Sequence, residues 1–109
     1  LKTDGPKSTI SPMLEFIKKY PDSIYTSSAY FGVAEFHFTS PSNYAEAKKY
    51  FDLVLKNYPN SPRAPRSVVR LYDIALNVDK DPTAAEEYKK ILLNNYASSE
   101  EAITFSKTP

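Results

Sequence analysis

The stretch YPNSPRAPRSVVRLYDIAL, residues 58–76, contains the pattern that decides the fold. Its first four residues end one helix and begin another, because a residue before proline avoids the helical region and Ser61 is a good helix cap. Related stretches are YPDS at residues 20–23 and YASS at residues 96–99, so the tyrosine recurs twice at one constant step, from i to i+38. We call this step the repeat period. A fixed period of roughly 20–50 residues is typical of stacked helical repeats rather than of one globular core.

The composition fits a folded helical domain. The chain has 109 residues, of which 41% are hydrophobic, and this is enough for one domain with a modest core. It has only two glycines, which suits helices better than hairpins. The net charge is +1, which provides no bulk attraction to nucleic acid or to an acidic membrane. We therefore expect no nucleic-acid partner.

Cysteine usage and apolar run length restrict the chemistry further. The chain has no cysteine, which excludes disulfides, thiol catalysis and thiolate metal sites and fits either the cytosol or an oxidising compartment. No apolar run approaches the roughly 18–20 residues needed to span a bilayer, so we expect no membrane span. No signal peptide is visible and residue 1 is Leu, which predicts a segment cut from a longer chain.

Start and stop signals divide the chain into six predicted helices with short links and no strand. Residues 1–9 are polar around Gly5-Pro6 and predict a disordered start or a tag remnant. Ser11-Pro12 matches a cap followed by the first helical residue. Short links imply antiparallel neighbours. The predicted helices span residues 12–20, 24–38, 44–58, 62–77, 82–96 and 99–107, with breaks at 39–42 and 77–80. The predicted helix caps are Ser23, Ser42 or Asn43, Ser61, Asp81 and Ser98. Ser98 stands at capping-box spacing from Glu101.

Moving the sequence by one repeat period aligns the inner faces of the helices as well. Small residues fall on small ones where helices must approach closely, and large residues fall on large ones that fill the space between turns. This alignment predicts one domain over residues 10–107, made of a half-unit 10–22, repeats 23–60 and 61–98, and a half-unit 99–107. The aligned sets are Thr26 with Ala64 and Ala102, Val33 with Leu71, Ala47 with Ala85, Tyr50 with Tyr88 and Val54 with Leu92.

Over about residues 10–106 the chain resembles the tetratricopeptide-repeat family. The family's second-helix pattern is matched by Ala47, Phe51, Val54 and Pro59, and its first-helix pattern by Tyr30, Val33, Ala34 and His37. The chain departs from the pattern in four places. Ala34 replaces the usual Gly, His37 the usual Tyr, Tyr72 is bulky where a small residue is usual, and Lys89 replaces the aromatic matched by Phe51.

The resemblance implies an all-α solenoid of antiparallel helix pairs wound into a right-handed superhelix. Long units that end in Tyr-Pro-(Asp/Asn)-Ser are similar to a subgroup found in bacterial envelope proteins of the outer-membrane-assembly lipoprotein and Tol-Pal-associated cell-division coordinator types. This subgroup implies a periplasmic or outer-membrane-associated parent protein, and a cytoplasmic location stays open. The family function implied is protein–protein interaction, with a protein or peptide partner held in a concave groove.

In this family the first helix of each pair lines the groove, so the resemblance also implies the site residues. Phe31 and Phe38 lie outside the inner stripe, and they either line the groove or pack on the neighbouring unit. Three arginines share one helical face, which suits an acidic partner; the alternative is a solvated face with Asp73 as local partner. The predicted groove residues are Ser28, Phe31, Glu35, Phe38, Arg63, Arg66, Val69, Arg70 and Asp73.

Nothing in the sequence predicts catalytic, cofactor-binding or metal-binding residues. His37 is the one histidine, and a lone histidine at a packing position is structural as a rule. Glu86-Glu87 and Glu100-Glu101 are adjacent in sequence, so each pair points to different sides of its helix. We therefore predict a non-catalytic scaffold. The alternative is a self-assembly module that forms homo-oligomers by stacking through its terminal half-repeats, and an enzyme requires residues outside this chain to complete a site.

Overall fold

The computed structural model describes residues 5–39 and 43–107, with side chains from residue 12 onward. The described part contains six α-helices and no strand, which confirms the all-α prediction. One π-helical turn continues the fourth helix. The elements are α1 Gly5–Lys19, α2 Thr26–Thr39, α3 Tyr44–Asn57, α4 Arg63–Asp73, η1 Ile74–Val78, α5 Pro82–Asn95 and α6 Glu100–Lys107.

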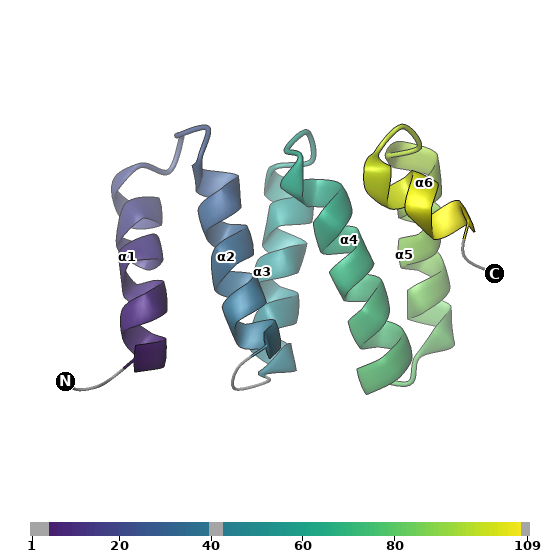
Figure 1. Cartoon of the computed structure of the whole chain (residues 1–109), viewed down its shortest axis with the longest axis horizontal. Coiled ribbons are helices and arrows are strands. Elements are labelled where there is room, and N and C mark those ends of the chain that lie inside the picture. The colour runs from purple at the N-terminus through teal and green to yellow at the C-terminus, as the bar shows by residue number, and fades with distance from the viewer. Residues whose placement is uncertain (1–4, 40–42, 108–109) are drawn as a thin grey trace.

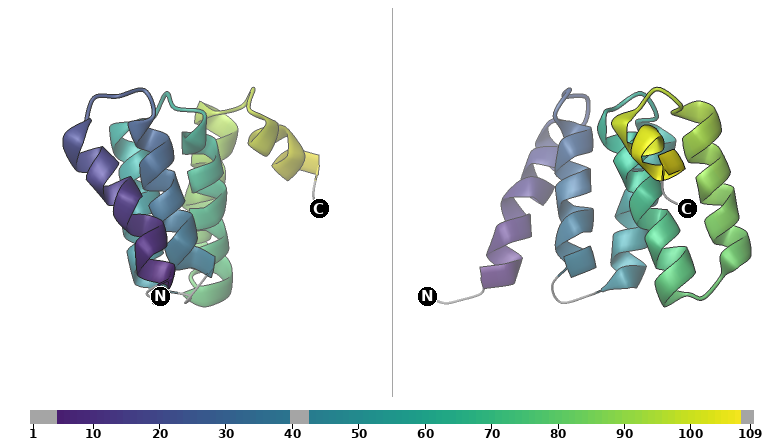
Figure 2. Two further views of the ribbon diagram at one scale, coloured as in Figure 1. Left: turned by 60° about the vertical axis from the view of Figure 1, so that its left-hand side comes forward. Right: turned by 45° about the vertical axis from the view of Figure 1, so that its right-hand side comes forward.

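The helices lie side by side in chain order, each packed on the next (Figure 1). Contacts also join α2 to α4 and α4 to α6, so α4 contacts helices on both sides. In Figure 1, α3 lies behind and between α2 and α4, and α5 stands beside α4 with α6 in front of it. Figure 2 shows α6 inclined against the other helices at the C-terminal end of the row. The described chain measures 46 × 30 × 19 Å, and contacts between near neighbours account for this elongated form.

The start of α1 differs from the sequence prediction. The helix begins at Gly5, with Pro12 inside it, so the predicted start at Pro12 is wrong. The repeat explains this start, because α3 and α5 moved back by one or two periods cover residues 6–19. Pro6 then takes the place of Pro82 in the first helical turn, where the missing N–H has no partner to lose. Residues 1–4 of the predicted disordered start lie outside the described residues.

Two predicted helix caps are confirmed by hydrogen bonds. The Asn43 side chain accepts from the backbone N–H of Glu46 at 3.3 Å, and the Asp81 carboxylate accepts from that of Ala84 at 3.1 Å. The Ser98 prediction is wrong, because the hydroxyl of the following residue, Ser99, accepts from the N–H of Ala102. The predicted break at residues 39–42 lies mostly outside the described residues.

The predicted turn after α4 begins later than expected. The helix continues to Val78 as the π-helical turn η1, which the N–H of Asp79 closes on the carbonyl of Ile74 at 2.8 Å. Lys80 then adopts φ 55°, in the left-handed region, and reverses the chain toward α5. At the start of α2, Ile24 and Tyr25 form a turn, so that helix begins at Thr26.

Hydrogen bonds repeat with the same period as the sequence. The Tyr58 hydroxyl donates to the carbonyl of Pro21 at 3.4 Å, and the Tyr96 hydroxyl donates to that of Pro59 at 2.8 Å. Tyr58 and Tyr96 therefore each join their own unit to the preceding one. The bond from Asn43 N to His37 O also recurs, one period later, from Asp81 N to Ala75 O.

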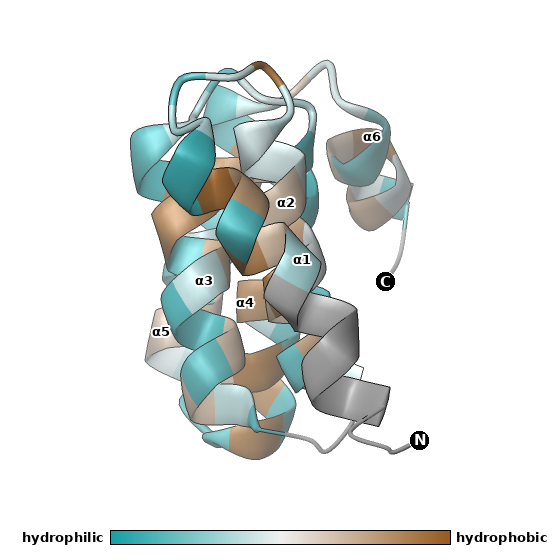
Figure 3. Ribbon diagram, turned by 90° about the vertical axis from the view of Figure 1, so that its left-hand side faces the viewer, coloured by the Kyte–Doolittle hydropathy of each residue, from teal (hydrophilic) through white to brown (hydrophobic). Residues whose placement is uncertain are grey.

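The core has two parts of unequal size. Figure 3 shows apolar residues gathered where α2 lies against its neighbours, with polar residues on the outward face of α3. The larger cluster joins α2 and α3 to α4, and the smaller one joins α4 and α5 to α6. The larger cluster contains Phe31, Ala34, Ala47, Phe51, Val54, Leu71 and Ile74, whereas the buried members of the smaller one are Val68, Leu92 and Ala102.

Candidate protein-binding groove

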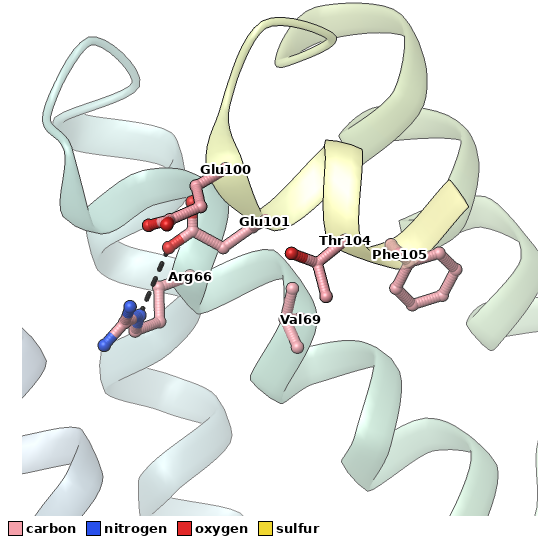
Figure 4. Close-up of a pocket in the computed structure, with 6 residues that line it drawn as sticks. All are labelled: Arg66, Val69, Glu100, Glu101, Thr104 and Phe105. Carbon is pink, nitrogen blue, oxygen red and sulfur yellow. Dashed lines mark hydrogen bonds and ion pairs between the residues drawn. The ribbon is translucent and has the colours of Figure 1, made fainter. Parts of the chain in front are cut away.

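Two adjoining clefts open where α6 lies against α4. The first has a volume of about 300 Å³ and the second of about 530 Å³, and Val69 and Phe105 line both. We call the two clefts together the α4–α6 groove. The first is lined by Arg66, Val69, Glu100, Glu101, Thr104 and Phe105 (Figure 4), and the second by Val69, Tyr72, Asp73, Lys89, Leu93, Phe105 and Ser106.

Phe105 is an apolar side chain that lines both clefts of the groove. Its ring meets the ring of Tyr72 edge-on, with the centroids 4.8 Å apart. Val69, Leu93 and Phe105 are only partly buried, although all three pack against the smaller core cluster. Their free surface gives the groove an apolar floor that a ligand side chain can cover.

Charged side chains form the rim of the first cleft. Nε of Arg66 donates to Oε2 of Glu101 at 3.2 Å, and this ion pair joins α4 to α6 (Figure 4). The arginine side chain is 48% exposed and the glutamate only 18%. The guanidinium therefore keeps much of its surface in water, and a pair of this kind contributes little to stability.

Asp73 is the charged residue of the second cleft that burial affects most clearly. Desolvation raises the pKa of its carboxyl above the ordinary 3.8, and the positive charge of Arg70 partly offsets this rise. Within residues 12–39 and 43–107, no hydrogen bond or ion pair reaches its side chain. The groove therefore contains a half-buried carboxylate beside an apolar floor.

The two phenylalanines that the sequence predicts in the groove belong to the core instead. Phe31 is only 7% exposed, and its ring centroid lies 5.5 Å from that of Phe51. The Phe38 ring lies edge-on to Phe51 at 6.1 Å and to Tyr44 at 5.7 Å. The prediction that Phe31 is exposed is wrong, because α3 and α4 close over α2 at this point. The alternative, packing on the neighbouring unit, is met through the arginines of that unit: the guanidinium carbon of Arg63 lies 5.5 Å from the Phe31 centroid, and that of Arg70 lies 5.0 Å from the Phe38 centroid.

The arginines on α4 form their hydrogen bonds with neighbouring helices rather than with Asp73. Nε of Arg63 donates to the Ser28 hydroxyl at 3.4 Å. Nε of Arg70 donates to a carboxylate oxygen of Glu35 at 3.0 Å. In these two pairs, and in the pair of Arg66 with Glu101, the partners are 35 residues apart in the sequence. This separation is three residues shorter than the repeat period. Facing helices of successive units are therefore offset by about one helical turn.

The groove brings together only part of the predicted site. Arg66, Val69 and Asp73 lie in it, whereas the other six predicted residues pack between α2 and α4. Sequence reasoning missed the contribution of α6, although the period carries Arg66 to Thr104 and so indicates which face of α6 is turned toward α4. The residues missed are Tyr72, Lys89, Leu93, Glu100, Glu101, Thr104, Phe105 and Ser106.

The groove combines an apolar floor with charged side chains at its rim. Within the described residues, no three or more His, Cys, Asp or Glu side chains form a group that could hold a metal ion. His37 lies away from the groove and stacks on Tyr50, with the ring planes 9° apart. None of the described helices is both long enough and apolar enough to cross a membrane.

Comparisons with protein-family models, curated proteins and solved structures found no match to this chain. The function is therefore inferred from the groove and from the differences between one repeat and the next.

Proposed function

We propose that this chain is a non-catalytic protein-interaction scaffold that holds a protein or peptide partner in the α4–α6 groove. In this proposal the helices form a tetratricopeptide-like solenoid of antiparallel pairs in a right-handed superhelix. The observation that carries it is the pair of adjoining clefts, which combine an apolar floor of Val69, Leu93 and Phe105 with charged groups at the rim.

The groove suits capture of a peptide side chain. Binding pockets for small groups measure roughly 300–1,000 Å³, and apolar walls with a few polar groups fix the ligand's orientation. The second cleft, at about 530 Å³, has this size and this lining. A buried aromatic or aliphatic anchor supplies most of the affinity in such contacts, while rim charges such as Arg66 and Glu101 govern orientation.

The proposed setting is a complex of the bacterial cell envelope, either in the periplasm or at the outer membrane. This part of the proposal rests on the resemblance of the long repeat units, with their Tyr-Pro-x-Ser endings, to envelope proteins of the outer-membrane-assembly and Tol-Pal-associated types. The hydroxyl bonds of Tyr58 and Tyr96 to the preceding units support the repeat itself, because they give the motif tyrosine one structural role in both units.

Photo-crosslinking tests the groove directly. A photoreactive phenylalanine analogue replaces Val69 in one variant and Asp52, an ion-paired residue of α3 outside the groove, in a matched control. Both proteins are irradiated in bacterial envelope and cytosolic extracts. We expect one discrete adduct from position 69 and none from position 52. Equal adducts from both positions, or none from position 69 while circular dichroism reports a folded protein, would contradict the proposal.

A second candidate function is self-assembly, which the exposed end at α1 and α2 favours. Ile24 is 83% exposed and Tyr25 is 65% exposed, and Leu14 and Tyr20, earlier in the chain, are exposed as well. At the positions of Ile24 and Tyr25, the third unit has Glu100 and Glu101. An apolar pair of this kind in one unit alone suits contact with a second copy.

Sedimentation over a range of protein concentrations tests this second function. The doubly substituted variant Ile24→Glu/Tyr25→Glu reproduces the residues of the third unit and serves as the control. If the exposed surface at Ile24 and Tyr25 joins two copies, the mass of the wild type should rise with protein concentration. The variant should not show this rise. A wild type that stays monomeric throughout the range would exclude this candidate.

A further inference from the structure

We call α2 with α3 the first helix pair, and α4 and η1 with α5 the second. The first pair shows how the fold holds an arginine from a neighbouring helix. Nε of Arg70, on α4, donates to Oε2 of Glu35, on α2, at 3.0 Å. The guanidinium carbon of Arg70 lies 5.0 Å from the centroid of the Phe38 ring. Both charged side chains are at least two-thirds buried, so the interaction takes place largely away from water.

The second helix pair has the acid of this arrangement but not the arginine. One repeat period carries Glu35 to Asp73 and Phe38 to Leu76. The same step carries Arg70 to position 108, where the sequence has threonine. Asp73 therefore occupies the position that binds an arginine in the first pair, and no described side chain bonds to it.

The second pair also has space that the first pair fills. In the first pair, Phe51 is fully buried and contacts the rings of both Phe31 and Phe38. One period later Phe51 becomes Lys89 and Phe31 becomes Val69, and both of these residues line the second cleft. Two aromatic rings of the first pair are thus absent from equivalent positions beside the opening of about 530 Å³ that Asp73 lines.

We propose that the second cleft of the α4–α6 groove binds a helix of a partner protein that presents one arginine beside apolar residues. The guanidinium pairs with Asp73 as Arg70 pairs with Glu35, and the apolar residues cover Val69 and Phe105. This inference rests on the proposed function and specifies the partner that the groove selects. Arg70 and Lys89 add positive charge around the cleft, so a single arginine fits better than a run of basic residues.

The chain itself supplies the probe for a test. Residues 69–78, VRLYDIALNV, form the part of α4 and η1 that contains Arg70 and lies against α2 and α3 in the first pair. This peptide, acetylated and amidated, is titrated into the 15N-labelled 109-residue protein, and amide shifts are followed by NMR because a short free helix binds weakly. The control peptide carries Arg70→Gln. The protein is used as wild type, as Asp73→Asn, and as Asp52→Asn, a matched control on α3.

The two peptides, with arginine or glutamine, are each combined with the wild-type and the Asp73→Asn protein. These four combinations form a double-mutant cycle that isolates the ion pair between the peptide arginine and Asp73. We expect the arginine peptide to shift the amides of Tyr72, Lys89 and Phe105. We also expect Arg70→Gln in the peptide, or Asp73→Asn in the protein, to weaken binding by about 3- to 10-fold, and the two together by no more than either alone. The Asp52→Asn protein binds like the wild type.

Two results would overturn the inference. One is equal affinity for the two peptides, with the same groove amides shifted, which leaves the groove as a binding site but removes the arginine. The other is no shift of groove amides by the arginine peptide at millimolar concentration. The proposed function is judged separately by crosslinking from position 69, so its failure is distinguishable from both results.

Discussion

The two complete helix pairs share one backbone plan but differ in how far their side chains close the space between helices. In the first pair, Phe31, Phe38 and Phe51 meet ring to ring under α4. In the second pair, Val69 and Lys89 stand at two of these positions and line an open cleft under α6. The closed and open pairs therefore differ in side-chain volume at a few inner positions.

The features that set the backbone are nearly unchanged between the pairs. Asn43 and Asp81 cap equivalent helices, and Tyr58 and Tyr96 reach equivalent carbonyls of the preceding units. The offset between facing helices is also the same, about one helical turn, for α2 against α4 and for α4 against α6. In both contacts the hydrogen-bonded side chains are 35 residues apart in the sequence. An open cleft can therefore develop within the repeat without a change of fold.

The largest expected effect is on the closed pair. Phe51→Ala removes a fully buried ring and should lower the free energy of unfolding by about 3–5 kcal/mol. The equivalent change in the open pair, Lys89→Ala, should alter it by only about 0.5 kcal/mol or less, because that side chain borders the cleft. Urea denaturation of the two variants measures the contrast, and equal losses would refute the distinction between closed and open pairs.

An intermediate effect is expected at the arginines. Arg70→Ala removes the bond to Glu35 and the contact with Phe38, and should cost about 1–2 kcal/mol of unfolding free energy. Arg66→Ala removes a more exposed pair with Glu101 and should cost about 0.5 kcal/mol. Thermal unfolding followed by circular dichroism compares them. A larger loss of unfolding free energy for Arg66→Ala would mean that the Arg66–Glu101 pair between α4 and α6 stabilises the fold more than the Arg70–Glu35 pair between α4 and α2.

A smaller effect is expected at the motif tyrosines. Tyr96→Phe removes a 2.8 Å bond to the carbonyl of Pro59, and should lower the free energy of unfolding by about 0.5–1 kcal/mol. Tyr58→Phe should cost less, because its bond to Pro21 is 3.4 Å long. Guanidinium denaturation resolves the order, and a greater cost at Tyr58 would contradict the structural ranking.

The smallest effect concerns pH and Asp73. Burial raises the pKa of this carboxyl in the folded state above 3.8, so the native protein binds the proton more tightly than the unfolded chain. Ionised Asp73 therefore opposes folding at neutral pH, and this cost disappears as pH falls below 3.8. Asp73→Asn should be slightly more stable than wild type at pH 7 and equal to it near pH 3.

Denaturation at both pH values checks this prediction, with Asp52→Asn as a control. Asp52 forms an ion pair with Lys56, 3.3 Å away, on the surface of α3, so its replacement should give no gain at pH 7. An Asp73→Asn protein that is less stable than wild type at pH 7 would show that the carboxylate has a stabilising partner.

Much of the fold could be predicted from the sequence because its signals are local. Proline stops, polar caps and the repeat period place all six helices, and Asn43 and Asp81 cap as predicted. The start of α1 is mispredicted because Ser11-Pro12 resembles a helix start, although the period places that start at Pro6. The cap of α6 is placed at Ser98 instead of Ser99 because the spacing from Ser98 to Glu101 matches a capping box.

The groove was predictable only in part because it depends on the offset between helices. Periodicity places Phe31 on the face of α2 turned toward the next unit, but it does not reveal that α3 and α4 cover it. In the same way, the partners of Arg66 and Arg70 lie 35 residues away, which no single-helix pattern indicates. The change from Phe51 to Lys89 was visible in the sequence, but the cleft appears only when α6 is in place.

The most direct measurement uses Lys89→Phe, which restores in the open pair the ring that Phe51 supplies in the closed one. Unfolding free energy and binding of the peptide of residues 69–78 are measured on the same protein. If the open cleft is the binding site, the variant gains about 1 kcal/mol of stability and loses measurable binding of that peptide. A variant that binds the peptide as well as wild type does would contradict the account.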